Sequence, residues 1–205
     1  MTTASVHVKK TFQSEFAGEK SGDYDYAALY RQRMIEFRRN KDSIVRVDKP
    51  LNLPRARELG YRAKEGFVVV RVRVRKGSGM HLRPTAGRRP KRMGVKKLTR
   101  RISIQAMAEQ RASKKHKNCE VLNSYLVGED GQTKYYEVIM VDTSHPVIVK
   151  DKKLKWITGE KGKKHRGRAD RGLTSAGSKM RGLRKRGIGA EKVRPSLRAH
   201  DRKAK

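Results

Sequence analysis

GFVVVRVRVRK, residues 66–76, is the stretch that decides the fold, because its apolar and basic side chains alternate with a period of two. One set consists of four valines, Val68, Val70, Val72 and Val74. The other set consists of Val69 and three arginines, Arg71, Arg73 and Arg75. Successive side chains of a β-strand point to opposite faces of the sheet. The stretch is therefore predicted to be a strand with one face in the core and one exposed cationic face.

Upstream of this strand, the sequence predicts two helices and a further strand. Residues 24–40 indicate an amphipathic helix, because four large side chains recur on one helical face. These side chains are Tyr26, Tyr30, Met34 and Phe37. SIVRV at residues 43–47 predicts a short strand, and residues 54–61 a short helix with a proline in its first turn.

Downstream of the strand, the sequence predicts a helix and a β-hairpin. The helix covers residues 104–116 and is expected to present one stripe of Ile104, Met107, Ala108 and Arg111. The hairpin strands are expected at residues 120–127 and 134–141, around a turn, GEDGQT, that supplies the usual turn chemistry. The order of elements along the chain is thus helix, strand, helix, strand, basic loop, helix, strand, strand and basic tail.

The charge of the chain bounds its function. Its 205 residues include 53 Lys and Arg but only 20 Asp and Glu, giving a formal net charge of +33. Such a chain repels itself unless a polyanion binds it. A single cysteine excludes an internal disulfide, and the absence of a long apolar run predicts a soluble, cytosolic protein with no membrane segment.

Two basic segments carry much of this charge. The basic loop, residues 75–101, contains eleven basic residues, no acidic residue and several glycines and prolines, which is typical of a long loop. The basic tail, residues 161–187, contains eleven basic residues and one acid, Asp170. Interleaved glycines let backbone N–H groups as well as side chains approach phosphates. Hydrophobic residues make up only 35% of the chain, so part of it is expected to stay extended or to fold on its partner.

Three enzyme or metal motifs are considered and set aside. GLTSAGSK, residues 172–179, has the glycine spacing of a nucleotide phosphate loop, but Ser178 precedes Lys179 where the order should be reversed, and no hydrophobic strand leads into it. Cys119 follows His116 closely, but a structural zinc site needs four ligands. The acidic pair at residues 129–130 is best explained as solvated turn residues. No cofactor, metal or small-molecule substrate is therefore expected.

The kind of polyanion follows from what the basic segments lack. Membrane-surface segments usually place basic residues beside an apolar helix face or a lipid anchor. Readers of double-stranded DNA normally present a recognition helix or zinc modules, and neither is recognisable here. Long irregular extensions are typical of proteins that bind a folded RNA, because an extended chain segment can enter RNA junctions and narrow grooves that a domain cannot. The rival hypothesis is a basic, chromatin-type protein that compacts DNA.

Several motifs, in order along residues 24–200, resemble one protein family. They are RELGYRAKEGFVVVRVRVRKG, AEQRA, NSYLVGEDG, KYYEVIMVD, RGLTSAGSKMRGL and GAEKVRPSLRA. The family is the archaeal and eukaryotic large-subunit ribosomal protein fifteen-e, and the last motif is similar to its archaeal branch. The resemblance implies a four-stranded, mainly antiparallel sheet covered by helices, with extensions threaded into ribosomal RNA. It also implies a structural protein without enzyme activity or cofactor, located in cytoplasmic ribosomes, that stabilises ribosomal RNA, supports assembly and contacts neighbouring large-subunit proteins.

With this resemblance, the chain divides into three parts. Residues 1–22 form an N-terminal segment of open role, residues 23–145 the α+β domain that contains the basic loop, and residues 146–205 a basic C-terminal extension threaded into RNA. Trp156 and Ile157 are expected to anchor this extension to the domain.

The expected RNA contacts lie in the cationic strand face, the basic loop and the C-terminal extension. They are Arg71, Arg73, Arg75, Lys76, Arg83, Arg88, Arg89, Lys91, Arg92, Lys96, Lys97, Arg100, Arg101, Lys163, Lys164, Arg166, Arg168, Arg171, Lys179, Arg181, Arg184, Lys185, Arg186, Arg194 and Arg198.

The sequence departs from the family pattern at Leu126 and Ala106, where an aromatic residue is common, and at Ser178, where a basic residue is usual. The two missing aromatic side chains predict either another residue in their space or a looser core.

Overall fold

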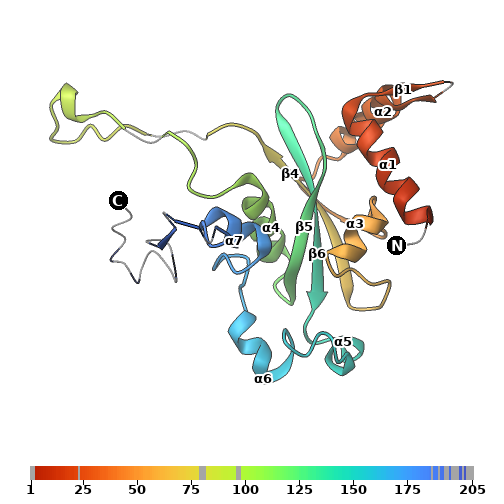
Figure 1. Cartoon of the computed structure of the whole chain (residues 1–205). Coiled ribbons are helices and arrows are strands. Elements are labelled where there is room, and N and C mark those ends of the chain that lie inside the picture. Colours follow the sequence, from red (N-terminus) through yellow and green to blue (C-terminus); the bar gives the residue numbers. More distant parts are fainter. Residues whose placement is uncertain are drawn as a thin grey trace.

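The computed structural model describes residues 3–22, 24–78, 82–95, 98–185, 187–188, 190–191, 194, 199 and 201. Its centre is a four-stranded, fully antiparallel sheet with the strand order β3-β4-β6-β5 (Figure 1). The strands are β3 (Ile44–Val47), β4 (Phe67–Arg75), β5 (Cys119–Glu129) and β6 (Thr133–Asp142). The predicted α+β class and the four predicted strands are confirmed, with each strand end within two residues of its expected position.

Helices cover both faces of this sheet. The helices on one face are α2 (Tyr26–Arg39) and α3 (Leu53–Glu58), whose Phe37 and Ala56 share a core with Tyr135 and Ile139. The helix on the other face is α4 (Ile104–Lys115), whose Ala108 packs in a second core with the β4 valines. The sheet therefore separates two cores.

Side-chain caps fix the starts of these helices. The Asp25 carboxylate accepts a hydrogen bond from Ala28 N at 3.0 Å at the start of α2, and the Ser103 hydroxyl accepts one from Ala106 N at 3.2 Å at the start of α4. Capping oxygens satisfy backbone N–H groups that lack an intrahelical partner. The predicted helices at residues 24–40 and 104–116 are confirmed by α2 and α4.

The buried stripe of α4 differs from the expected one at one position. Arg111 is exposed, whereas Glu109 is fully buried between Ala108 and Ala112. The expectation that Arg111 lies on the stripe is therefore wrong, and the residue two positions earlier is the polar member of the interface.

The N-terminal segment packs against the domain. It forms α1 (Thr3–Ala17), followed by a small hairpin of β1 (Lys20–Ser21) and β2 (Tyr24–Asp25). An ion pair joins Glu15 of α1 to Arg33 of α2, and the rings of Phe16 and Tyr30 meet edge to face with centroids 5.8 Å apart. Residues 3–22 are therefore part of the folded unit.

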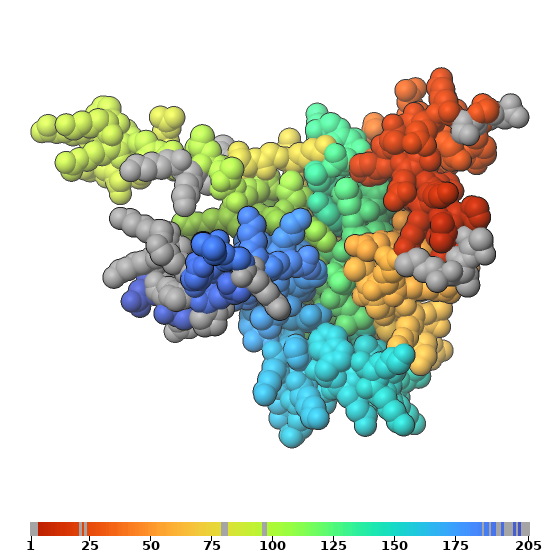
Figure 2. All heavy atoms as spheres, viewed as in Figure 1, coloured from red at the N-terminus to blue at the C-terminus, as the bar shows by residue number. Residues whose placement is uncertain are grey.

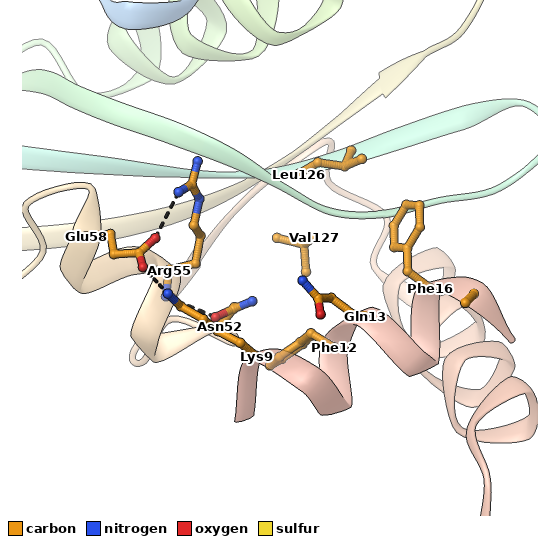
Figure 3. Close-up of a pocket in the computed structure, with 10 residues that line it drawn as sticks. Lys9, Phe12, Gln13, Phe16, Asn52, Arg55, Glu58, Leu126 and Val127 are labelled. Atoms are coloured by element: carbon orange, nitrogen blue, oxygen red, sulfur yellow. Dashed lines mark hydrogen bonds and ion pairs between the residues drawn. The ribbon is translucent and has the colours of Figure 1, made fainter. Parts of the chain in front are cut away.

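A pocket of about 670 Å³ lies between α1, α3 and β5 (Figure 3). Phe12 and Phe16 of α1 form one wall, and Leu126 and Val127 of β5 form the opposite wall. The position at which the family often has an aromatic residue, Leu126, therefore borders open space, which agrees with a looser packing there.

The first part of the C-terminal extension folds back onto the sheet. It contains α5 (Pro146–Lys150), α6 (Gly159–Gly162), the short 3-10 helix η2 (Lys163–His165) and α7 (Ser175–Met180). Ile148, Leu154 and Ile157 are buried in the same core as α2, and Ala169 is buried in the core beneath α4. The predicted anchor is buried at Ile157, while Trp156 remains 38% exposed. The folded unit therefore continues past residue 145.

Candidate RNA interface

The basic loop leaves β4 and extends away from the sheet as an arm before it returns to α4 (Figure 1). Apart from the 3-10 turn η1 (Pro90–Arg92), residues 82–95 have no regular secondary structure, as the glycines and prolines predict. Arg88, Arg89, Lys91 and Arg92 surround a hollow of about 520 Å³. The long irregular loop is confirmed.

The cations at residues 82–95 of this arm are exposed and have no acidic partner in the described chain. Arg83, Arg88, Arg89, Lys91 and Arg92 are all exposed, and within the described part of the chain none of them pairs with an Asp or Glu. Clustered like charges repel and raise the local potential. The arm therefore carries positive charge that no acidic side chain of the described chain compensates, and an external anion can bind there.

The remaining basic residues of the loop differ in their surroundings. Lys76 pairs with Glu129 at 3.4 Å, and Arg100 donates to the Arg75 carbonyl at 3.5 Å. Lys134 also pairs with Glu129 at 2.7 Å, and the pKa of Glu129 is held below its usual range mainly by this lysine. Arg101 is exposed. Lys96 and Lys97 lie outside the described residues.

The cationic face of β4 is only partly exposed. Arg71 lies beneath α2, where its guanidinium stands 4.0 Å from the Phe37 ring centroid and donates to Glu137 at 3.0 Å. Glu137 is fully buried and also accepts hydrogen bonds from the Tyr125 hydroxyl and, at 3.0 Å, from Leu51 N. The expectation that Arg71 lies on an exposed face is wrong, because α2 covers that part of the strand and a buried carboxylate neutralises it. Arg73 is half-buried, and Arg75 is exposed.

A buried hydrogen-bond network holds the basic tail on the sheet. The carboxylate of Glu109 on α4 accepts from the Ser124 hydroxyl on β5 and from the Thr174 hydroxyl, each at 2.5 Å. Thr174 also caps α7 by accepting from Gly177 N at 3.1 Å. Burial raises the pKa of Glu109, and the two hydroxyl donors partly offset this. One carboxylate therefore joins a helix, a strand and the tail.

The glycines of GLTSAGSK serve packing at this point. A Cβ atom on Gly177 would lie 2.5 Å from the Cα atom of Gly172, and Gly172 itself has a φ of +67°. The two chain segments therefore touch backbone to backbone, which only glycine permits. The glycine spacing that resembles a nucleotide loop follows from this contact, and no described strand leads directly into α7.

Arg168 binds the domain itself. Its guanidinium donates to the carbonyls of Val121 and Leu122 on β5, at 2.6 and 2.9 Å, and lies 5.0 Å from the Trp156 ring centroid. Burial lowers the pKa of Arg168. These bonds make Arg168 an anchor of the tail on β5. The sequence predicts an RNA contact for this residue, but its guanidinium is bound within the protein.

The other basic residues of the tail are more open. Arg181 donates to the Gly172 carbonyl at 3.3 Å, and Arg184 bonds the Ser175 hydroxyl. Arg194 is half-buried, whereas Arg186 and Arg198 lie outside the described residues. Among the predicted RNA contacts in the tail, the exposed cations are Lys163, Lys164, Arg166, Arg171, Lys179, Arg184 and Lys185.

The arm and α7 of the tail lie on the side of the molecule away from α1, whereas the tail begins at α6, at the bottom of the view (Figures 1 and 2). Ser103, at the end of the arm, approaches Met180 of α7, with its backbone N 3.3 Å from Sδ. We call the exposed cations of both segments the basic surface: Arg83, Arg88, Arg89, Lys91, Arg92, Arg101 and the seven tail residues above. The sequence predicts these cations but does not reveal the roles of Glu109 and Thr174. The one hint in the sequence is that Glu109 is a carboxylate among the alanines of a helix.

Other chemistry has no geometric support in the described residues. No cluster of three or more metal-ligating side chains occurs there. Cys119 is buried, which raises the pKa of its thiol to about 11. No described helix combines the length and the apolar character needed to cross a membrane.

Comparisons with known proteins identify the family of this chain. The model of the protein family described as "Ribosomal L15" matches residues 10–200. Large ribosomal subunit protein eL15 of Methanocella arvoryzae is 55% identical over 177 residues, covering 86% of this chain and 88% of the relative. The eL15 protein of Methanospirillum hungatei JF-1 is 55% identical over 183 residues, covering 89% and 91%. The chain therefore belongs to the eL15 family of ribosomal proteins.

Proposed function

We propose that this protein is a structural constituent of the large ribosomal subunit, and that its basic surface binds and stabilises folded ribosomal RNA. The observation that carries the proposal is the arm, whose exposed arginines and lysines have no acidic partner in the described chain. The names of the relatives, which are large ribosomal subunit proteins, support RNA of that subunit as the partner. The role is structural, non-enzymatic and cytoplasmic, within ribosomes.

The architecture explains how such binding would work. The sheet and its two cores give a rigid base, and the Glu109 network fixes the tail to it. A preorganised base lowers the entropy lost when RNA binds. The arm then reaches beyond the domain and neutralises phosphates in an RNA junction, which supports assembly of the subunit. The side of α1 is left for neighbouring ribosomal proteins.

A charge-removal experiment tests this proposal. The double variant Arg89→Ala, Arg92→Ala should bind a large-subunit RNA transcript more weakly. Because each neutralised phosphate contributes about 0.7 to 0.9 to the slope of log affinity against log salt, that slope should fall by about 1.4 to 1.8. Filter binding between low and moderate salt measures both quantities.

The matched control removes the same charge from the opposite side. Lys10 and Arg31 are exposed on α1 and α2, so Lys10→Ala, Arg31→Ala should change the slope little. Sedimentation of the tagged endogenous protein provides the cellular test. Migration with the nucleoid instead of the large subunit would favour a DNA-compacting protein, and salt-independent RNA binding would contradict the proposal.

A further inference from the structure

The open end of the cationic face of β4 forms a groove of about 630 Å³. Arg73 and Arg75 of β4, Thr133 and Tyr135 of β6, and Arg38 of α2 line it, with Asp130 at its rim. Strand register places Arg75 opposite Thr133 and Arg73 opposite Tyr135. The next pair on this face is Arg71 and Glu137, which α2 buries. The groove therefore opens just beyond the Arg71–Glu137 pair, where no buried carboxylate neutralises the arginines of β4.

The charges around the groove are positive in sum, and hydrogen bonds hold Arg73 and Asp130 in place. Arg73 donates to the carbonyls of Asn40 and Lys41, at 3.3 and 3.2 Å, which pins its guanidinium at the end of α2. Asp130 is already engaged, because one of its oxygens accepts from two turn N–H groups and the other lies 3.5 Å from Arg38. Arg75 is exposed and has no acidic partner within the described residues.

Two hydroxyl groups of the groove residues lack a hydrogen-bond partner. Tyr135 is 2% exposed, and neither its Oη atom nor the Oγ1 atom of Thr133 has a partner among the described residues. A buried hydroxyl without a partner costs free energy. An acceptor-rich ligand removes this cost, and phosphate oxygens accept well from hydroxyl and guanidinium donors together.

We propose that this groove binds one backbone phosphate of RNA, with the hydroxyls of Tyr135 and Thr133 and the guanidinium of Arg75 as donors. The proposal rests on the proposed function, because it names a discrete contact within the RNA interface. Position supports it: Arg75 is the last residue of β4, so an RNA strand lying along the arm passes the groove.

Tyr135→Phe is the decisive variant, because it changes the free protein and the complex in opposite directions. Removing an unpaired buried hydroxyl should leave the thermal midpoint of the free protein unchanged or raise it. The same change removes a donor to a charged oxygen, so the affinity for the large-subunit RNA transcript should fall by about tenfold. Tyr24→Phe is the matched control, because Tyr24 is exposed in β2 beside the start of α2.

Phosphorothioate interference on the same transcript locates the contact. Wild-type protein should show a backbone position whose interference is lost in Tyr135→Phe and in Arg75→Ala but retained in Arg89→Ala. An interference pattern that Tyr135→Phe leaves unchanged would overturn the proposal. Failure of wild-type protein to bind the transcript would instead overturn the proposed function.

Inorganic phosphate separates the two possible sources of the ligand. If phosphate alone raises the thermal midpoint of the wild-type protein but not of Tyr135→Phe, while no Tyr135-dependent RNA position exists, the groove takes free phosphate and the RNA assignment is wrong. A Tyr135-dependent RNA position supports the assignment whether or not phosphate alone has an effect.

Discussion

At the scale of single residues, Glu109 shows how one buried carboxylate can order a distant segment. Its two oxygens accept from Ser124 and Thr174, and each hydroxyl already accepts a hydrogen bond from another donor: Gln105 Nε2 at 2.9 Å and Gly177 N at 3.1 Å. Each hydroxyl must therefore donate its proton to Glu109. A carboxylate offers one acceptor oxygen to each hydroxyl, whereas a glutamine side chain would have only one oxygen for the two.

Glu109→Ala should destabilise the protein strongly. The change leaves two buried hydroxyl donors without an acceptor, and each such group costs about 1–3 kcal/mol. We expect the free energy of unfolding to fall by about 2–6 kcal/mol, measured by chemical denaturation of the RNA-free protein.

Glu160→Ala provides the matched control for this variant. The Glu160 side chain is 93% exposed, and its ion pair with Lys163 spans 3.5 Å at the surface. Exposed pairs contribute about 0–1 kcal/mol. Equal stability losses in the two variants would contradict the network as the anchor of the tail.

At the scale of elements, β4 shows what the sequence can and cannot predict. Its alternation predicts the strand, the core valines and the basic face, because side-chain direction has a period of two whatever lies around it. Whether each arginine is exposed or buried depends on residues that are distant in the sequence. Arg71 is covered by α2 and paired with Glu137, 66 residues away, while Arg75 lies beyond the end of α2. Periodicity carries no information about such coverage.

The same limit applies to the tail. Its charge and glycines predict an irregular basic segment, but the structure places the short helices α6, η2 and α7 in it, joined by irregular connections. Its packing depends on scattered small residues, such as Ala169 and Ala176, that form no periodic stripe. Glycine spacing alone equally suits a phosphate loop and a close backbone contact, and only the fold distinguishes them.

Gly177→Ala should separate these two roles of the glycine in α7. The added Cβ would overlap the backbone of Gly172 at 2.5 Å, and a backbone neighbour cannot move aside as a flexible side chain can. Overpacking of this kind costs about 1–3 kcal/mol. We expect a lower thermal midpoint in the RNA-free protein.

The control for this variant is Gly94→Ala in the basic loop, where an added Cβ meets nothing within 4 Å. Its thermal midpoint should stay close to that of the wild type. If Gly177→Ala weakened RNA binding without lowering the stability of the free protein, the glycine would serve phosphate contact instead of packing.

At the scale of the whole molecule, the net charge of +33 is divided between a folded unit and an arm. The folded unit neutralises part of its charge internally, as in the pairs of Arg33 with Glu15 and of Arg62 with Asp151. The arm has no such pairs in residues 82–95 and projects from the domain surface (Figure 2). Local opening is easiest where few apolar contacts hold the chain.

Limited trypsin digestion of the RNA-free protein should therefore begin in the arm, at Arg88, Lys91 and Arg92, which are all exposed. The bond after Arg168 should resist, because its guanidinium is held by two carbonyls of β5 and the neighbouring Ala169 is 1% exposed. Mass spectrometry of early fragments gives the order of cleavage, and Glu109→Ala should make the Arg168 site labile by releasing the tail.

Early cleavage after Arg168 in the wild type would mean that the tail is not docked without RNA. Protection of the arm on addition of the large-subunit transcript, with no change at Arg168, is the pattern expected if RNA orders the arm on an already folded base.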